Sequence, residues 1–407
     1  MLKAVHGSAR VLLHRREVGE LTFAAGGCTF RYTDDLLDPE HQVLGQEFEE
    51  APRKLYRESV GLPAWFANLL PEPGSGLRRF YAALFDERQV DDARLLLTLG
   101  DDLPGAATVV PSDVPAEGFL VQPAIARVEQ TGVHLSALAG AQPKMSVQRD
   151  GKRLTLPGRG EAGGWIVKFS SGSFPSLTEN EYLMMRWAAE AGLDVPEIDL
   201  LPAESVPHVF DELQPGSLAY VVKRFDRGAE GQRVHIEDLA QATGIIPALR
   251  FHGATYDNIG VLVRALTGDS GFAEYLRRLV AMVVMGNTDA HLKNWSLRYP
   301  DGRTPTLAPA YDLVCTTFYR TLSRQLVFPI GGRHRPDAAD LDAFEQVAEA
   351  AGYPDGEASA VVLETAERLR DAWREVRREP LLPELIAHID ERLERHPLTR
   401  LGRHRAG

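Results

Sequence analysis

The sequence of 407 residues has few cysteines and lacks long apolar runs. Its two cysteines, Cys28 and Cys315, exclude a framework of disulfide bonds and a metal site built from several thiolates. No stretch approaches the roughly 18 consecutive apolar residues of a membrane-spanning helix. The first residues also lack the apolar segment of a secretory signal, so we expect a cytoplasmic protein without a membrane association.

Positive charge is scarce relative to negative charge. The chain has 45 lysines and arginines against 57 aspartates and glutamates, which gives a formal net charge of −12 at pH 7. Proteins that bind nucleic acid unaided usually carry the opposite excess. We therefore expect any contact with DNA to run through a partner protein.

The chain has no internal repeat and no low-complexity segment, so its domains are predicted from changes in pattern. Short apolar and alternating segments before residue 33 predict a β-meander, and helices are predicted at 63–70 and 91–99. Strand patterns return at 133–225, around one predicted helix at 178–191. Further amphipathic helices are predicted at 271–285, 338–351, 356–378 and 383–395. The result is an α+β protein with a small N-terminal domain (1–115), a β-rich lobe (133–225) and a helical lobe (226–407).

The segment from Gly286 to Trp295 carries the densest group of side chains suited to catalysis. Asp289 is followed by Asn294, and a predicted hairpin then leads to Asp312. D-x-x-x-x-N is the spacing of a kinase catalytic loop, in which the aspartate positions the attacking hydroxyl and oxygen ligands hold Mg²⁺. The spacing alone is weak, because such residues are common in loops, and His291 with the two aspartates would also allow a metal triad.

Two charged residues upstream favour phosphoryl transfer. Lys168 lies in an apolar strand segment, 165–169, and Glu181 lies on the apolar stripe of the helix predicted at 178–191. They match the strand lysine and helix glutamate that form an ion pair in the small lobe of kinases. Each residue also has an explanation that involves no function. Lys168 could reach solvent with its ammonium group, and Glu181 could be stabilised by the helix dipole. Their order along the chain, ahead of the loop with Asp289, favours the kinase interpretation.

The turn from Leu138 to Met145 is a candidate for covering phosphate groups. Gly140 would let the backbone approach a phosphate closely, and Lys144 would add positive charge. The chain contains neither G-x-G-x-x-G nor a Walker A motif, so an ordinary hairpin turn is the alternative interpretation.

Together these residues resemble the HipA family of serine/threonine kinases, the toxin component of bacterial HipBA toxin–antitoxin systems. The resemblance covers most of the chain, through segments 61–72, 139–144, 180–182, 222–227, 237–241, 288–294 and 311–313. It implies a two-lobed protein kinase that uses ATP and Mg²⁺ to phosphorylate a bacterial protein, for which an aminoacyl-tRNA synthetase is the best-known type, and so arrests growth. It also implies a HipB-like helix-turn-helix antitoxin that binds operator DNA, which agrees with the acidic composition.

The resemblance implies a role for each site residue. Asp289 would be the catalytic base, Asn294 and Asp312 would hold Mg²⁺, and Lys168, paired with Glu181, would contact the ATP phosphates. The other nucleotide contacts would come from the loop residues Ala139, Gly140, Ala141, Gln142, Pro143 and Lys144, from a hinge of Lys223, Arg224 and Phe225 whose backbone reads the adenine edge, and from His291 and Tyr311.

One departure from the family concerns regulation. The family typically carries an autophosphorylated serine three residues before the loop glycine, where this chain has Ala137. Ser136 is one position away, so either Ser136 takes this role in a shifted register or the switch is absent.

Two rival functions remain open at this point. One is a small-molecule or lipid kinase, because phosphoinositide kinases share the D-x-H-x-x-N pattern, although the HipA-like N-terminal domain argues against it. The other is a non-catalytic kinase fold that only engages an antitoxin and its operator. The presence of Lys168, Asp289, Asn294 and Asp312 argues against this second possibility.

Overall fold

The chain folds into two compact units, and the polypeptide passes repeatedly from one to the other. The computed structural model describes residues 5–24, 26–85, 87–112, 138, 142–151, 153–157, 163–170, 174–206, 216–228, 231–354 and 356–401. The first unit comprises Met1–Phe169, Pro202–Arg250 and Leu297–Thr304, and the second comprises Ser170–Leu201, Phe251–Ser296 and Pro305–Gly407. Ser136 and the loop residues Ala139, Gly140 and Ala141 lie outside the described residues, and the domain boundaries expected from the sequence stay a prediction.

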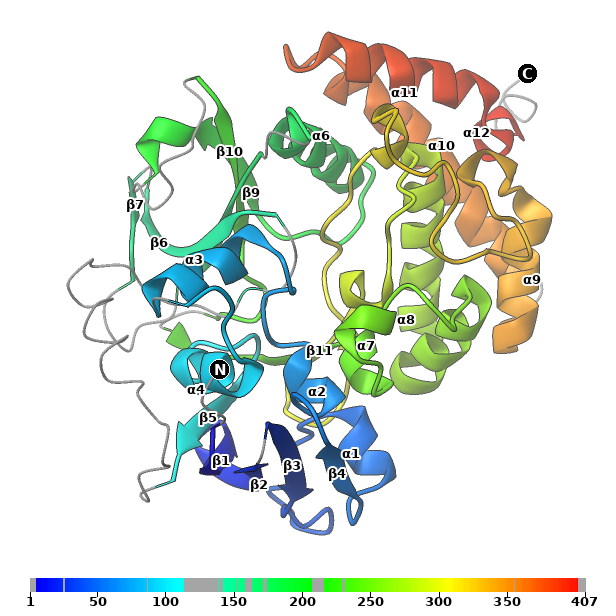
Figure 1. The fold of residues 1–407 in the computed structure, drawn as a ribbon. Coiled ribbons are helices and arrows are strands. Elements are labelled where there is room, and N and C mark those ends of the chain that lie inside the picture. Colours follow the sequence, from blue (N-terminus) through cyan, green and yellow to red (C-terminus); the bar gives the residue numbers. More distant parts are fainter. Residues whose placement is uncertain are drawn as a thin grey trace. The chain divides into compact units, whose positions relative to one another are not determined.

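The N-terminal part of the first unit contains an antiparallel sheet, drawn in blue and cyan in Figure 1. Its strands lie in the order β4-β3-β2-β1-β5 and comprise β1 (Gly7–Leu13), β2 (Arg16–Ala24), β3 (Gly27–Tyr32), β4 (Leu55–Glu58) and β5 (Ala107–Pro111). The first three strands pair in sequence order, which confirms the predicted meander. Phe30 of β3 is fully buried. Its ring centroid lies 4.9 Å from that of Phe48 and 4.7 Å from that of Phe66. Aromatic residues of the meander and of the segments that follow it thus pack together in the core of this domain.

Short helices lie between β3 and β5 along the chain. They are α1 (Gln46–Glu50), α2 (Ala64–Ala67), α3 (Gly76–Leu84) and α4 (Asp92–Leu99). The prediction for 91–99 is confirmed, because the Asp91 carboxylate caps α4 by accepting hydrogen bonds from the amides of Ala93 and Arg94. The prediction for 63–70 was too long, and α2 ends at Ala67. Pro71 disfavours helical backbone at the residue before it, which opposes extension to Leu70.

A second antiparallel sheet of the first unit carries the lysines that the sequence singled out. Its strands β7 (Arg153–Thr155), β6 (Lys144–Asp150), β8 (Trp165–Phe169) and β10 (Leu218–Lys223) lie side by side in this order. The chain then continues through β11 (His235–Asp238), α7 (Leu239–Ala242) and a 3-10 turn at Pro247–Leu249. The Asp238 carboxylate accepts from the Gln241 amide, and the Gln241 side chain accepts from the Asp238 amide, so α7 begins with a capping box.

The second unit is mainly helical. It contains α6 (Leu177–Glu190), α8 (Tyr256–Met285), α9 (Leu341–Ala351), α10 (Glu357–Val376), α11 (Pro383–Arg395) and α12 (Pro397–Leu401), together with most of β9 (Ile198–Pro202). The predicted helices are confirmed, but α8 begins 15 residues before the expected start at Gly271, and Gly268 interrupts it with non-helical backbone. Among the described residues, no helix is long and apolar enough to cross a membrane.

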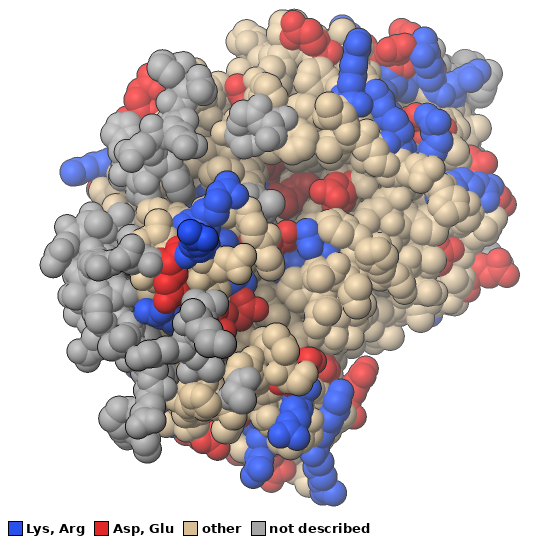
Figure 2. Space-filling view, in the orientation of Figure 1, with Lys and Arg blue, Asp and Glu red and all other residues tan. Residues whose placement is uncertain are grey.

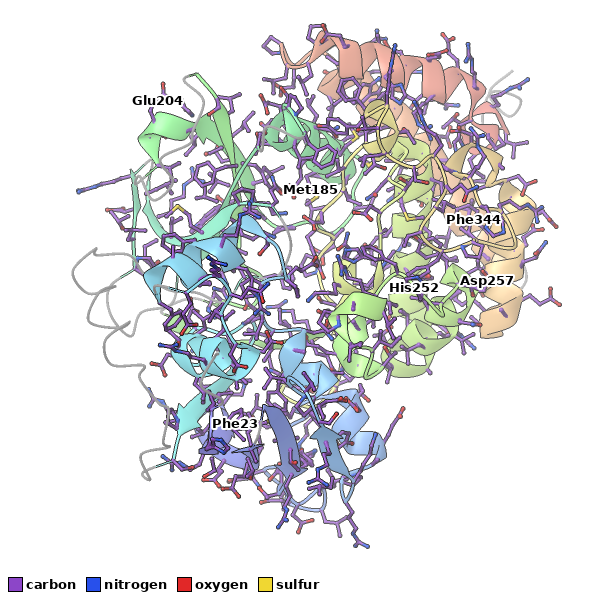
Figure 3. The ribbon with its side chains drawn as sticks, in the orientation of Figure 1. Phe23, Met185, Glu204, His252, Asp257 and Phe344 are labelled. Carbon is purple, nitrogen blue, oxygen red and sulfur yellow. The ribbon has the colours of Figure 1, made fainter. Side chains whose placement is uncertain are left out.

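The core of the second unit forms where its helices pack together. Trp187 of α6 lies 4.7 Å from Trp373 of α10, measured between ring centroids, and its Nε1 donates to the Leu369 carbonyl at 2.7 Å. Met185 on α6 and Phe344 on α9 are fully buried side chains of this unit (Figure 3). Helix α6, which carries Glu181, is therefore fixed to the helical core by a buried aromatic contact and a hydrogen bond.

The surface over the C-terminal helices carries charges of both signs. Figure 2 shows Lys and Arg side chains interspersed there with Asp and Glu. Several pair three or four residues apart along one helix, as Arg368 does with Glu364 and Arg395 with Glu391. Such mixed charge differs from the basic surface of proteins that bind nucleic acid unaided.

Candidate active site

The segment with Asp289 starts at a tightly fixed helix end. Gly286 caps α8 with a left-handed backbone, φ 78°, and a Cβ atom there would lie 2.3 Å from Oγ1 of Thr317. The Arg392 guanidinium of α11 donates to the carbonyls of Val283 and Val284, at 2.8 and 3.3 Å, in the last turn of α8. These contacts satisfy the helix end and allow only glycine at position 286 without rearrangement.

Asp289 is an exposed residue, and both the N–H and the carbonyl of its backbone make hydrogen bonds. Its N–H donates to Oδ1 of Asn287 at 2.9 Å, and its carbonyl accepts from the N–H of His291 at 2.8 Å. The same carbonyl accepts from Nδ2 of Asn294 at 3.2 Å, within the 3-10 turn Leu292–Asn294. With Nδ2 used in this way, Oδ1 of Asn294 is the atom of that side chain suited to binding a cation.

Asp312 follows strands β12 (Ser296–Tyr299) and β13 (Thr306–Leu307), with the predicted turn at Gly302, φ 78°. Its own backbone is left-handed, φ 56°, which a residue with a side chain rarely adopts. The Asp312 carbonyl accepts a hydrogen bond from Nδ2 of Asn287 at 3.3 Å. The side chain of Asn287 therefore contacts both Asp289 and Asp312, and the structure brings together Asp289, Asn294 and Asp312 as the sequence order suggested.

Buried threonines attach the segment after Asp312 to the loop that carries Asp289. The Thr316 hydroxyl accepts from the amide of Thr288 at 2.7 Å and donates to the carbonyl of Gly286 at 3.1 Å. The amide of Thr317 donates to the same carbonyl at 3.1 Å. Sequence reasoning missed Thr316, Thr288 and Asn287, although Asn287 and Thr288 precede Asp289 directly and could have been weighed with it.

His291 and Tyr311, which the sequence also predicted at the site, make different contacts. The His291 ring packs edge-on against Phe251, with ring centroids 5.0 Å apart. The Tyr311 hydroxyl donates to the carbonyl of Lys293 at 2.8 Å and lies 2.7 Å from Oγ of Ser296, so it braces the loop. Within the described part of the chain, no group of three or more His, Cys, Asp or Glu side chains is arranged to hold a metal ion. The metal triad around His291 therefore finds no support.

The first unit places two lysines opposite each other. Lys168 on β8 pairs in register with Lys144 on β6 and with Tyr220 on β10, so all three side chains leave the same face of the sheet. All three are buried, and Nζ of Lys168 lies 5.8 Å from the centroid of the Tyr220 ring. Two lysine side chains of neighbouring strands thus lie on one face of this sheet.

The described end of the 139–144 loop is fixed to β8. The Gln142 side-chain amide donates to the Phe169 carbonyl at 3.2 Å, and the Pro143 carbonyl accepts from the Phe169 amide at 3.0 Å. Glu181, buried on α6, belongs to the second unit and Lys168 to the first, so their ion pair stays a prediction.

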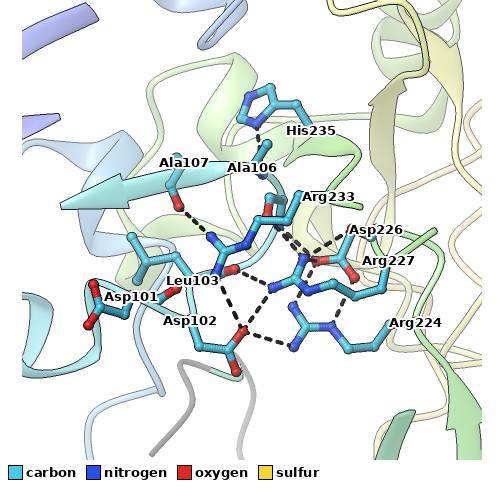
Figure 4. Close-up of polar contacts among 11 residues, drawn as sticks. Asp101, Asp102, Leu103, Ala106, Ala107, Arg224, Asp226, Arg227, Arg233 and His235 are labelled. Atoms are coloured by element: carbon cyan, nitrogen blue, oxygen red, sulfur yellow. Dashed lines mark hydrogen bonds and ion pairs between the residues drawn. The ribbon is translucent and has the colours of Figure 1, made fainter. Parts of the chain in front are cut away.

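The predicted hinge carries a buried charge cluster. The Arg224 guanidinium bonds the Asp226 carboxylate at 2.9 and 2.8 Å, and Arg227 bonds Asp226 at 2.7 Å and Asp102 at 2.9 Å (Figure 4). Burial alone would raise the pKa of Asp226, but the ion pairs with Arg224 and Arg227 hold it well below the ordinary value. Nη1 of Arg224 also donates to Asp102 at 3.5 Å, so its side chain links the hinge to the N-terminal domain. The backbone N–H of Arg224 donates to the Gly164 carbonyl at 2.9 Å.

Comparison with known proteins assigns the family. The model of the HipA N-terminal domain matches residues 9–110, and that of the HipA-like C-terminal domain matches residues 136–373. The chain is 35% identical over 404 residues to "Putative kinase Y4dM" of Sinorhizobium fredii, covering 96% of each chain. It is 32% identical over 374 residues to "Putative kinase Y4mE" of the same organism, covering 83% of this chain and 84% of that one.

The fold also matches a solved structure. HipA of Shewanella oneidensis MR-1, solved in a complex of HipA, HipB and operator DNA, superposes with a TM-score of 0.68 at 20% identity, covering 96% of each chain. The chain therefore has the mixed α+β kinase fold with an N-terminal sheet domain and a helical C-terminal part. It belongs to the HipA family, which confirms the resemblance seen in the sequence, and membership of a kinase family implies the use of ATP.

Proposed function

We propose that this chain is a cytoplasmic, ATP- and Mg²⁺-dependent protein serine/threonine kinase. The observation that supports this most is the hydrogen-bonded loop that holds Asp289, Asn294 and Asp312 together within the second unit. In the proposed mechanism the Asp289 carboxylate orients the attacking hydroxyl and accepts its proton as the phosphoryl group transfers. Its surface exposure suits a substrate as large as a protein, because a protein hydroxyl must reach it.

The oxygen atoms around Asp289 suit Mg²⁺. Mg²⁺ prefers hard oxygen ligands and is usually bound through one or two carboxylates together with substrate phosphates. The Asp312 carboxylate and Oδ1 of Asn294 would hold it, and the bound ion would neutralise charge on the phosphates. The fixed backbone of Asp312 and the Nδ2 hydrogen bond of Asn294 set the positions of these two ligands.

The lysine pair of the first unit suits the phosphates of ATP. Lys144 and Lys168 pair in register on neighbouring strands, and lysine ammonium groups commonly bind phosphate. We assign the phosphate contact to Lys168, with Glu181 as its ion-pair partner, and the covering loop to residues 139–144. The backbone of Lys223, Arg224 and Phe225 would contact the adenine edge, and His291 and Tyr311 would contribute from the second unit.

We further propose that the chain acts as a toxin whose activity a helix-turn-helix antitoxin of HipB type restrains. Support comes from family membership and from the HipA neighbour, which was solved with HipB and operator DNA. The net charge of −12 agrees with contact to DNA only through that antitoxin. The substrate would be a bacterial protein, such as an aminoacyl-tRNA synthetase, and its phosphorylation would arrest growth.

Incubation of the purified chain with labelled ATP, Mg²⁺ and bacterial cell proteins tests this function. We expect label on serine or threonine of a cellular protein, and none with the Asp289→Asn variant. Label only on small molecules or lipids would support the rival kinase class, and no ATP turnover at all would support the non-catalytic one. Phosphosite mapping of the same sample would test autophosphorylation at Ser136, which stays a prediction.

A further inference from the structure

We propose that Asn287 is a positioning residue that sets the relative geometry of Asp289 and Asp312 through the two ends of its side-chain amide. The proposal rests on the kinase function proposed above. Asn287 is 2% exposed, and its backbone N–H donates to the Met282 carbonyl at 2.9 Å, which fixes the start of its side chain to the end of α8.

The two ends of the amide make different hydrogen bonds. Oδ1 accepts from the N–H of Asp289 at 2.9 Å, and Nδ2 donates to the carbonyl of Asp312 at 3.3 Å. The amide group is planar, so a shift of one backbone is passed to the other through a rigid connection. Only asparagine offers an acceptor and a donor at this length, because aspartate lacks the donor and glutamine is longer by one methylene.

Both bonded groups lie where small displacements matter. Asp312 has a left-handed backbone, φ 56°, which must be held by contacts because its Cβ is crowded there. The bond from Asn287 is one of these contacts, and it orients the peptide from which the metal-ligating carboxylate projects. At Asp289, the N–H bond complements the carbonyl bonds from His291 and Asn294, so the carboxylate starts from a fixed backbone.

A merely structural role for Asn287 makes a different prediction. If the Asn287 side chain only stabilised the end of α8, its loss would lower the stability of the protein. The dependence of turnover on Mg²⁺ would then stay unchanged in the folded enzyme. If it positions the two carboxylates, its loss changes turnover and the Mg²⁺ requirement, because partners that orient metal ligands typically affect metal affinity or activity by about 10–100-fold.

The experiment uses the full chain and three variants. Asn287→Ala removes both hydrogen bonds. Asn287→Asp keeps the acceptor for Asp289 but removes the donor to Asp312, at nearly constant shape. Asn258→Asp is the matched control, because Asn258 is exposed in the first turn of α8, where a carboxylate is tolerated. Turnover is measured against ATP and against Mg²⁺, with the thermal unfolding midpoint recorded for each protein.

We expect kcat of Asn287→Ala to fall by about 10–100-fold, with a smaller change in KM for ATP. For Asn287→Asp we expect the Mg²⁺ concentration at half-maximal turnover to rise at least about tenfold. Asn258→Asp should match the wild type. If Asn287→Ala does not fold, the near-isosteric Asn287→Asp still decides the matter.

Two results would overturn the proposal in distinguishable ways. Folded Asn287 variants with the turnover and Mg²⁺ dependence of the wild type would refute the positioning role and leave the kinase function standing. A wild-type chain without turnover and without Mg²⁺-dependent nucleotide binding, measured by calorimetry, would refute the kinase function and with it the role of Asn287.

Discussion

The side chain of Asn180 makes two hydrogen bonds to the backbone of Cys315, accepting from its N–H at 2.9 Å and donating to its carbonyl at 3.1 Å. Asn180 is fully buried on α6, one residue before Glu181, and Cys315 follows Asp312 by three residues. The position of the helix that carries Glu181 is therefore tied to that of the segment that carries Asp312.

The first prediction follows from this contact. Asn180→Ala would leave the N–H of Cys315 without this partner and its carbonyl with the bond from the Phe318 amide at 3.3 Å, so we expect the free energy of unfolding to fall by about 1–3 kcal/mol. Urea unfolding measures the loss, with Asn258→Ala as the exposed control. A loss below about 0.5 kcal/mol would show that Asn180 does not hold the segment.

The glycine at the end of α8 gives a second prediction. Gly286 has a left-handed backbone with φ 78°, and Gly286→Ala would add a Cβ atom only 2.3 Å from Oγ1 of Thr317. Gly253→Ala is the matched control, because it has φ 74° but nothing within 4 Å of the added atom. We expect the control to lose about 1 kcal/mol of stability from backbone strain alone, and Gly286→Ala to lose clearly more. Equal losses would mean that the contact with Thr317 adjusts freely.

A buried glutamate of the first unit gives a pH prediction. Glu237 accepts hydrogen bonds from the Tyr299 hydroxyl, the backbone N–H of Gln46 and Nε1 of Trp65, and burial raises its pKa to about 8 from an ordinary value of 4.5. Between these values the folded state keeps a proton that the unfolded chain has released. The contribution of Glu237 to stability therefore declines as the pH rises from about 4.5 to about 8.

Comparison with Glu237→Gln isolates this contribution. His235 titrates in an overlapping range with the opposite sign, because burial lowers its pKa to about 4. The difference in unfolding free energy between wild type and Glu237→Gln removes this background. As the pH rises, we expect the wild type to lose unfolding free energy relative to Glu237→Gln, by up to about 1.4 kcal/mol per pH unit. A difference independent of pH from 4.5 to 8 would contradict the raised pKa.

Asp312 gives the metal prediction. Asp312→Asn removes the carboxylate charge, while asparagine tolerates the left-handed backbone that φ 56° requires. We expect ATP binding in the presence of Mg²⁺ to weaken at least about tenfold, because a metal ligand is lost. Calorimetric titration of ATP with and without Mg²⁺ measures this effect. Equal weakening without Mg²⁺ would argue that Asp312 contacts the nucleotide directly.

Much of the local structure was predictable because it depends on neighbouring residues. The strand at 165–169 follows from its apolar and β-branched residues, and the helix at 91–99 from its cap at Asp91 and its end at Gly100. The first half of α8 was missed because Gly268 and Gly271 interrupt the helical pattern, although the helix continues on both sides.

The contacts that hold the candidate site could not be predicted in the same way. Asp289, Asn294 and Asp312 could be selected from the sequence, since their types and spacing match the pattern of kinase catalytic residues. The roles of Asn180 and of the Arg224 cluster depend on partners 135 and 122 residues away along the chain. Only tertiary structure supplies such pairings.

The most direct test of the account is the transfer of the γ-phosphate of ATP to protein by Asp289→Asn. This change keeps the shape of the side chain but removes the proton acceptor, so phosphoryl transfer should fall by at least about 100-fold while calorimetric ATP binding stays close to that of the wild type. Turnover of the variant at the wild-type rate would remove Asp289 from the catalytic role and contradict the proposed mechanism.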